Sequence, residues 1–209
     1  GSDFAKQMAN DFNPLHDAHA KRFCIPGDLL FAIILSKYGI SQHMEFIFPG
    51  MVTAGVELVL PAPSGELHIN DTNGREYLRV KRAGDLTHAE ALIRNLTQSY
   101  VEFSGQTFPH ILVPLLAEQQ VMIHPERPMV IYESMTIDLD RLDITHPVLQ
   151  ADYNQLEING KRGSVELAFH LEEGGEIVGR GKKHMLLSGL REYDEDVVVS
   201  AIATYNRSK

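Results

Sequence analysis

The sequence predicts an α+β fold made of two antiparallel sheets, each wrapped around a central apolar helix. A helix-like apolar run followed by strand-like runs occurs twice along the 209 residues, at a spacing of about 80 residues. Hairpin signals, Asn73-Gly74 and Asn159-Gly160, separate strand-like runs in both halves. An antiparallel sheet needs cover on at least one face, and a buried helix laid across each sheet supplies it.

The first half contains the clearer of the two apolar helices, which we expect over Leu29 to Tyr38. Asp28 favours a helix start, and Gly39 can adopt the left-handed conformation that ends a helix. The helix is apolar nearly all round, so protein should surround it on most sides. Strand-like runs follow at residues 44–48, 56–60, 66–69 and 77–80.

The second half begins with a polar helix, expected from about Thr87 to Phe103, which links it to the first. A second apolar helix is expected from Pro109 to about Met122, because proline is tolerated at a first helical position. Strands should follow at 129–137, 155–158, 163–171 and 176–187, and a final helix at 194–205. We therefore expect residues 1–86 and 87–209 as two units joined edge to edge, which would protect strand edges. The alternative is one α+β domain without duplication.

Composition excludes several classes of protein. The formal net charge of −9 disfavours a nucleic-acid partner, since an acidic surface repels phosphates. One cysteine, Cys24, allows no intrachain disulfide and fits a reducing compartment. The longest apolar run, Leu29 to Leu35, falls far short of the roughly 20 residues that span a bilayer. We expect a cytoplasmic protein without a signal peptide, a metal or another cofactor.

One short segment concentrates residues suited to catalysis. Asp11 and His16 stand five positions apart, with Asn13 and Pro14 between them. Asn, Asp and Pro in close succession favour a turn. Across such a turn the carboxylate and the imidazole can hold one water between them. Gly27, further along, opens the first apolar helix, where a backbone N–H favours negative charge.

The segment Asp11-Phe12-Asn13-Pro14-Leu15-His16 resembles the D-x-N-P-[LIV]-H motif of the MaoC-like, (R)-specific enoyl-CoA hydratase 2 group. Residues Glu45 to Leu58 are similar to that group's F-x-F-x-x-P-V-x-x-G-D-x-L strand pair. The likeness covers residues 8–60 and is architectural over 100–190. It implies a double hotdog, in which each sheet wraps a central helix. The whole chain is also similar to a bacterial family of unknown function, which implies no activity.

The resemblance to the hydratases implies interconversion of enoyl-CoA and (R)-3-hydroxyacyl-CoA, with an acyl-CoA or other acyl thioester as partner. It makes His16 the base and Asp11 its partner acid or base, with Asn13 and Pro14 setting the turn. The N–H of Gly27 would be the oxyanion donor. The sequence departs from the pattern at Pro26, where the hydratases usually have a histidine, and bulky Phe31 could fill a substrate tunnel.

Two other functions stay open. A catalytically silent hotdog protein could bind acyl-CoA or another apolar ligand, as Pro26 and the crowded helix favour. A hotdog acyl-CoA thioesterase would use a carboxylate to activate water, with Asp28 or Glu45 as first candidates. The alternative interpretation of the segment itself is that Asp11 caps a turn and His16 is a structural histidine. A homodimer is compatible with the sequence.

Other notable residues have simpler interpretations. The segment from Ser104 to His110 is a degenerate echo of the first motif, in which His110 could line a pocket. Cys24 is interpreted as a small core residue. His16, Asp17 and His19 lack the spacing of a zinc site. The basic pairs are interpreted as solvated strand ends, with coenzyme A phosphates as the alternative ligand; they are Lys81-Arg82, Lys161-Arg162 and Lys182-Lys183.

Overall fold

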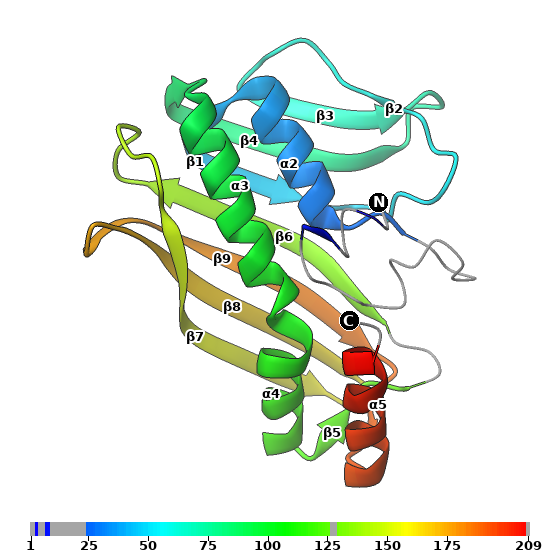
Figure 1. Cartoon of the computed structure of the whole chain (residues 1–209). Helices are drawn as coiled ribbons and strands as arrows, with labels where there is room; N and C mark the ends of the chain where they lie inside the picture. The colour runs from blue at the N-terminus through cyan, green and yellow to red at the C-terminus, as the bar shows by residue number, and fades with distance from the viewer. Residues whose placement is uncertain (1–2, 4–6, 9–23, 126–128, 208–209) are drawn as a thin grey trace.

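The computed structural model describes residues 3, 7–8, 24–125 and 129–207. The dominant element is one antiparallel sheet of eight strands, in the order β2-β3-β4-β1-β6-β9-β8-β7. Helices α2 and α3 both lie against one face of this sheet (Figure 1). The α+β class is therefore confirmed, but the two expected sheets form one continuous sheet, because β1 and β6 pair at its centre.

The bounds of the elements follow chain order. The strands of the main sheet are β1 (Ile40–Ile47), β2 (Leu58–Val59), β3 (Glu66–Asp71), β4 (Glu76–Thr87), β6 (Val130–Leu139), β7 (Val148–Asn159), β8 (Arg162–Glu173) and β9 (Glu176–Ser188). The helices are α2 (Gly27–Tyr38), α3 (Glu90–Gly105), the π-helix η2 (Phe108–Leu112), α4 (Val113–Glu118) and α5 (Glu195–Arg207). A small second sheet pairs β5 (Val121–Met122) with β10 (Arg191–Glu192). None of the helices in the described part of the chain is long and apolar enough to cross a membrane.

The two halves of the main sheet have matching strand orders. The first half reads β2-β3-β4-β1 and the second, from the opposite edge, reads β7-β8-β9-β6. In each half the first long strand therefore lies at the centre of the sheet. The two central strands pair antiparallel, residues 43–47 of β1 with residues 134–138 of β6. Each half thus protects an edge of the other.

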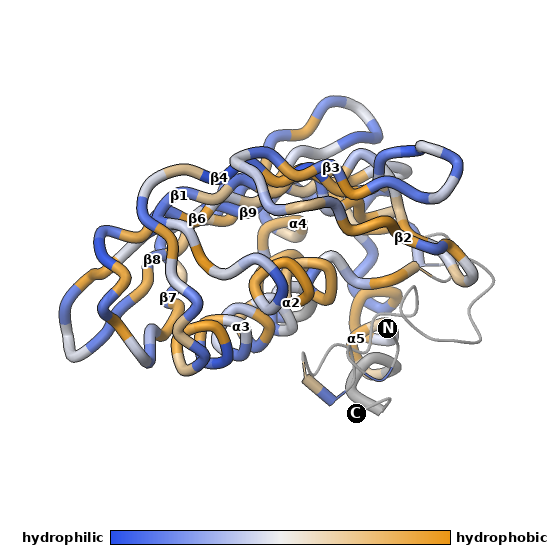
Figure 2. The backbone as a smooth tube through the Cα atoms, turned by 90° about the horizontal axis from the view of Figure 1, so that it is seen from above, coloured by the Kyte–Doolittle hydropathy of each residue, from blue (hydrophilic) through white to orange (hydrophobic). Residues whose placement is uncertain are grey.

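The first apolar helix is confirmed as α2. It begins at Gly27, two residues before the predicted start, and ends at Gly39, whose φ is 76°. The N–H of Gly39 donates to the carbonyl oxygen of Leu35 at 3.0 Å, as expected of a left-handed helix end. Phe31 and Leu35 are almost fully buried. Figure 2 shows the cause: the sheet curves over α2 and α3, which both lie on its concave side.

The helix over the second half of the sheet is α3, which the sequence predicted as a polar linker. Leu92, Leu96 and Tyr100 recur every four residues along it, so they form one buried face. This face packs against α2 and β7. Near the end of α3, the ring of Phe103 lies 5.3 Å from the ring of Phe169 on β8, centroid to centroid. The remaining face of α3 is polar, which explains the linker interpretation.

The predicted second apolar helix, from Pro109 to about Met122, is helical only as far as Glu118 and is not one continuous α-helix. The chain forms the π-helix η2, then the short α4, and residues 121–122 are the strand β5. Pro114 gives one reason, since a proline inside a continuous helix removes a backbone hydrogen bond and its ring clashes with the preceding turn. The structure places Pro114 in the first turn of α4, where it is tolerated. Gln120, with a φ of 54°, ends the helical segment.

Candidate functional site

The candidate site is a pocket of about 130 Å³ where the start of α2, the end of α3 and the strands β6 and β9 meet. Most of its walls are apolar. These walls come from Ile25, Leu30, Phe48, Met51, Val52, Leu112, Val130, Ile131 and Met185. A small number of polar groups in a mainly apolar pocket is typical of small-molecule sites.

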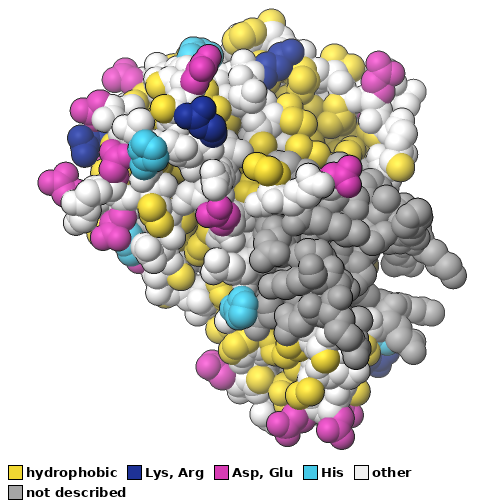
Figure 3. All heavy atoms as spheres, in the orientation of Figure 1, with side chains coloured by type: hydrophobic (Ala, Val, Ile, Leu, Met, Phe, Trp, Pro, Cys, Tyr) yellow, Lys and Arg dark blue, Asp and Glu magenta, His cyan; other side chains and the backbone are white. Residues whose placement is uncertain are grey.

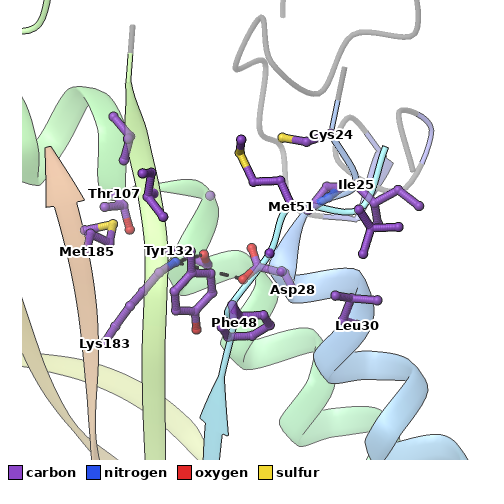
Figure 4. Close-up of a pocket in the computed structure, with 18 of the residues that line it drawn as sticks. Cys24, Ile25, Asp28, Leu30, Phe48, Met51, Thr107, Tyr132, Lys183 and Met185 are labelled. Atoms are coloured by element: carbon purple, nitrogen blue, oxygen red, sulfur yellow. Dashed lines mark hydrogen bonds and ion pairs between the residues drawn. The ribbon is translucent and has the colours of Figure 1, made fainter. Parts of the chain in front are cut away.

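The polar groups of the pocket are Asp28, Lys183, Ser104 and Thr107, and all four are buried. Lys183 Nζ donates to Ser104 Oγ at 2.5 Å and lies 3.9 Å from Asp28 Oδ1. Figure 4 shows Lys183 on β9 reaching toward Asp28 on α2. The 3.9 Å separation is too long for a hydrogen bond. Asp28 Oδ1 therefore has no hydrogen-bond partner among the described residues, and Thr107 Oγ1 has none either.

Lys183 is a functional candidate that the sequence analysis missed. The pair Lys182-Lys183 was interpreted as a solvated strand end, which holds for Lys182, because it is exposed and bonds Glu166 at 3.0 Å. Lys183 points to the other face and is only 5% exposed. The signal was present in the sequence: Lys183 shares its side of β9 with Met185, two positions along, and alternate residues of a strand face the same way.

Tyr132 reaches the pocket through an irregularity in β6. It pairs with Met185 of β9, whereas Ser134 pairs with His184, so Glu133 is the extra residue of a β-bulge. Without this bulge, strand alternation would turn Tyr132 to the convex face, where Ser134 lies. The bulge thus aims the Tyr132 ring at the pocket.

The hydroxyl of Tyr132 is hydrogen-bonded to the hydroxyl of Tyr100 on α3. Burial raises the pKa of both phenols well above their ordinary value, and the nearby Asp28 carboxylate raises each pKa further. The two tyrosines are therefore neutral at physiological pH. The Lys183 ammonium lies over the Tyr132 ring, 4.3 Å from its centroid, which is a favourable cation–π contact.

The predicted catalytic segment, residues 11–16, lies outside the described part of the chain. Asp11, Asn13, Pro14 and His16 lie outside the described residues, as do Asp17 and His19. Their predicted roles stay predictions. Among the residues that are described, no group of three or more His, Cys, Asp or Glu side chains could hold a metal ion.

Gly27, the predicted oxyanion donor, does line the pocket at the start of α2. A Cβ added there would lie 2.6 Å from Cδ1 of Tyr132, so the ring packs directly on the glycine backbone. This contact gives a structural reason for glycine at the position. Helix geometry leaves the N–H groups of Gly27 and Asp28 without an intrahelical acceptor, and Pro26 offers no side-chain cap.

The remaining sequence candidates lie apart from the polar groups. Glu45 is on the convex face of β1, where its carboxylate accepts a hydrogen bond from Lys81 at 2.8 Å. His110 is exposed and is not among the residues that line the pocket. Cys24 is buried and forms part of the wall, in keeping with the prediction of a small core residue. Of the two carboxylates considered for water activation, Asp28 is the one in the pocket.

The basic pairs that could bind phosphate are partly engaged in contacts within the protein. Lys81 bonds Glu45, and the guanidinium of Arg82 donates to the carbonyl oxygen of Tyr38 at 2.6 Å. Figure 3 shows one face of the molecule, on which the basic side chains of described residues lie apart and apolar side chains gather in two areas. On this face the basic side chains do not converge as a phosphate site requires.

Comparisons with known proteins identify a family and several similar structures. The model of the family described as "Protein of unknown function (DUF3581)" matches residues 1–196. A search of curated proteins found no match.

Similar solved structures include three thioesterases. An acyl-CoA thioesterase II from Mycobacterium marinum is 12% identical, with a TM-score of 0.46 over 81% of this chain and 90% of that chain. A putative thioesterase II from Thermobifida fusca is 9% identical, with a TM-score of 0.47 over 85% and 91%. A putative oleoyl thioesterase from Lactobacillus plantarum is 10% identical, with a TM-score of 0.42 over 75% and 77%.

Proposed function

We infer that this chain, which belongs to the DUF3581 family of proteins of unknown function, hydrolyses an acyl thioester in the pocket at the start of α2. One observation carries the proposal. Asp28 is a carboxylate, 7% exposed, that lines an otherwise mainly apolar pocket and has an oxygen without a hydrogen-bond partner among the described residues. A buried acceptor left unsatisfied is costly, so its retention points to a group that binds there during function.

The proposed reaction uses Asp28 as general base. Asp28 Oδ1 accepts a proton from a water molecule, and the water oxygen attacks the thioester carbonyl carbon. The carbon–sulfur bond then breaks, and the departing thiolate takes the proton back from the Asp28 carboxyl. A water can contact both Asp28 Oδ1 and Lys183 Nζ, because 3.9 Å between these atoms leaves room for two ordinary hydrogen bonds that meet at about a right angle.

Two donors are proposed for the oxyanion that forms on the carbonyl carbon. One is the ammonium of Lys183, which lines the pocket. The other is the N–H of Gly27 at the start of α2, where the helix dipole favours negative charge. Donors fixed in place before the reaction stabilise such a charge most effectively.

We also propose that residues 1–86 and 87–209 are two hotdog units of one double hotdog. The matching strand orders of the two halves support this division. So does the presence of one long helix on the concave side of each half, α2 in the first and α3 in the second. In this arrangement the pocket draws on both units, with Asp28 from the first and Lys183 from the second.

Hydration of an enoyl thioester by Asp11 and His16 is retained as a second candidate, because the resemblance of the segment 11–16 favours it. A silent ligand-binding protein is the third, and the ion pair between Asp28 and Lys183 favours it, since it can be read as a purely structural contact. The three functions differ in what they do to a substrate, so one set of assays separates them.

The test uses butanoyl-CoA and crotonyl-CoA, with thiol release and loss of the enoyl absorbance followed side by side. Thiol release should fall by about 10²–10⁴-fold in Asp28→Asn, as expected for loss of a general base. Glu45→Gln is the matched control, because Glu45 lies on the convex face of the sheet and should leave the rate unchanged.

Other outcomes contradict the proposal and favour a rival. Thiol release that survives Asp28→Asn contradicts it directly. Enoyl loss abolished by Asp11→Asn and by His16→Ala would support the hydratase. Absence of both reactions, together with thermal stabilisation by acyl-CoA, would support the silent binding protein.

A further inference from the structure

The inner end of the pocket is closed by aromatic rings. Tyr132 lines the pocket, and its hydroxyl bonds that of Tyr100, which is fully buried. Behind them, Phe31 packs 4.5 Å from the Tyr100 ring and 5.2 Å from the Phe46 ring, centroid to centroid. The space between α2 and the sheet is therefore filled with side chains beyond Tyr132. Phe31 is thus one of the side chains that fill the space where a longer substrate tunnel would run.

The Tyr132 ring is held on three sides and cannot swing away to admit a longer chain. The Phe48 ring lies 4.6 Å from the Tyr132 ring, centroid to centroid. On another side the Gly27 backbone packs so closely that a Cβ added to Gly27 would lie 2.6 Å from Cδ1 of Tyr132. Lys183 Nζ lies 4.3 Å from its centroid. Figure 4 shows Tyr132 standing between Phe48 and Lys183 at the pocket. A ring packed in this way moves only if its neighbours also move.

The size of the pocket sets the size of what it accepts. Its volume is about 130 Å³. For comparison, an engineered apolar cavity of about 150 Å³ in another protein binds benzene, a ligand of six carbon atoms. The pocket therefore has room for an acyl group of about that size.

We propose that the pocket accepts short acyl groups, of up to about six carbon atoms, and that the ring of Tyr132 sets this limit. The inference rests on the proposed thioester hydrolysis and names the substrate class for that reaction. Tyr132 acts as the closed end of the acyl site, and its aromatic volume determines the chain length that fits. The apolar walls favour a hydrocarbon group up to this limit.

The first experiment needs no variant. The full-length protein is assayed for thiol release from acetyl-, butanoyl-, hexanoyl-, decanoyl- and hexadecanoyl-CoA, and kcat/KM is compared across the series. It should fall at least about tenfold between hexanoyl- and decanoyl-CoA, because a single methylene that does not fit a pocket already costs about that much. Equal values for butanoyl- and hexadecanoyl-CoA would overturn the proposal.

The second experiment tests Tyr132 itself. Tyr132→Ala removes the ring, so the ratio of kcat/KM for decanoyl-CoA to that for butanoyl-CoA should rise at least about tenfold. Tyr132→Phe is the matched control, because it keeps the ring and should leave the ratio unchanged. A Tyr132→Ala protein with native circular dichroism and an unchanged ratio would overturn the role of Tyr132. If that variant does not fold, the wild-type series still decides the chain length.

The outcomes distinguish this inference from the proposed function. If no acyl-CoA of any length releases thiol, the proposed hydrolysis fails. The same acyl-CoA series is then used in thermal unfolding, where bound ligand raises the melting temperature. Stabilisation confined to the short chains supports the closed acyl site, whereas stabilisation that increases up to hexadecanoyl-CoA overturns it.

Discussion

The contact between Asp28 and Lys183 should make a measurable contribution to the stability of the fold. Their side chains are 10% and 6% exposed, and the charged atoms lie 3.9 Å apart. With an effective dielectric constant of about 20, Coulomb's law gives roughly 4 kcal/mol at this separation. Asp28→Asn leaves a buried ammonium without its counter-charge, and Lys183→Met leaves a buried carboxylate. Each single variant should therefore lose about 3–5 kcal/mol in the free energy of unfolding.

The double variant should lose less than the sum of the two single losses, by roughly 4 kcal/mol, because no lone charge stays buried. Urea unfolding near neutral pH, followed by circular dichroism, gives the four free energies that the comparison needs. Losses that add to within about 0.5 kcal/mol would refute the reasoning that the two charges interact in the interior.

A second ion pair supplies the control for this measurement. Glu45 and Lys81 lie closer together, with 2.8 Å between carboxylate and ammonium, but their side chains are 39% and 52% exposed. Water screens such a pair, so the cycle of Glu45→Gln and Lys81→Met should give a coupling of about 0.2–1 kcal/mol. The contact between Asp28 and Lys183 is longer, but because it is buried its coupling energy should exceed that of Glu45 and Lys81.

Two further predictions concern stability. An added Cβ at Gly181 would lie 2.4 Å from the backbone oxygen of Thr136. Gly181→Ala should therefore lower the free energy of unfolding by about 3 kcal/mol, as measured by thermal unfolding. At Gly163 the nearest atom is in a flexible side chain at 3.2 Å, so Gly163→Ala should cost less than about 1 kcal/mol, and equal losses would contradict this. The hydroxyl of Tyr153 donates to Glu166 and lowers its pKa. The folded-state pKa of Glu166 is then below the unfolded value of about 4.3, so its contribution is present above that pH and lost as pH falls through the folded pKa. In Glu166→Gln, the free energy of unfolding should fall less steeply with decreasing pH in the acid range than it does in the wild type. An unchanged pH dependence there would contradict a lowered pKa of Glu166.

The parts of the fold with strong periodicity were predictable from the sequence. The helix α2 and the strands β3, β8 and β9 lie within a few residues of their predicted positions, because apolar patterning marks their buried sides. The strand β7 was predicted at 155–158 but runs from Val148 to Asn159. It is an edge strand, exposed along much of both faces, so alternation is weak along most of its length. For α3, the spacing of Leu92, Leu96 and Tyr100 marks the buried face in the sequence, but the many polar residues around it favoured a linker instead.

The candidate site was only partly predictable. Asp28 and Glu45 looked equivalent as water-activating carboxylates until the fold placed them on different sides of the sheet. Lys183 could have been found from strand alternation, as described above. Tyr132 could not, because its direction depends on the bulge at Glu133, and a bulge leaves no clear mark in a single sequence.

The central pairing of β1 with β6 also bears on how the chain folds during synthesis. His43 on β1 pairs with Asp138 on β6, so the innermost contacts of the sheet join positions far apart in the chain. While β6 is still being translated, β1 has an unsatisfied row of backbone groups that another nascent chain could pair with. Contacts of such long sequence separation form late, because loop closure precedes them. Assembly of the pocket, which draws Asp28 and Lys183 from the two sides of this seam, therefore belongs to the last stage of folding.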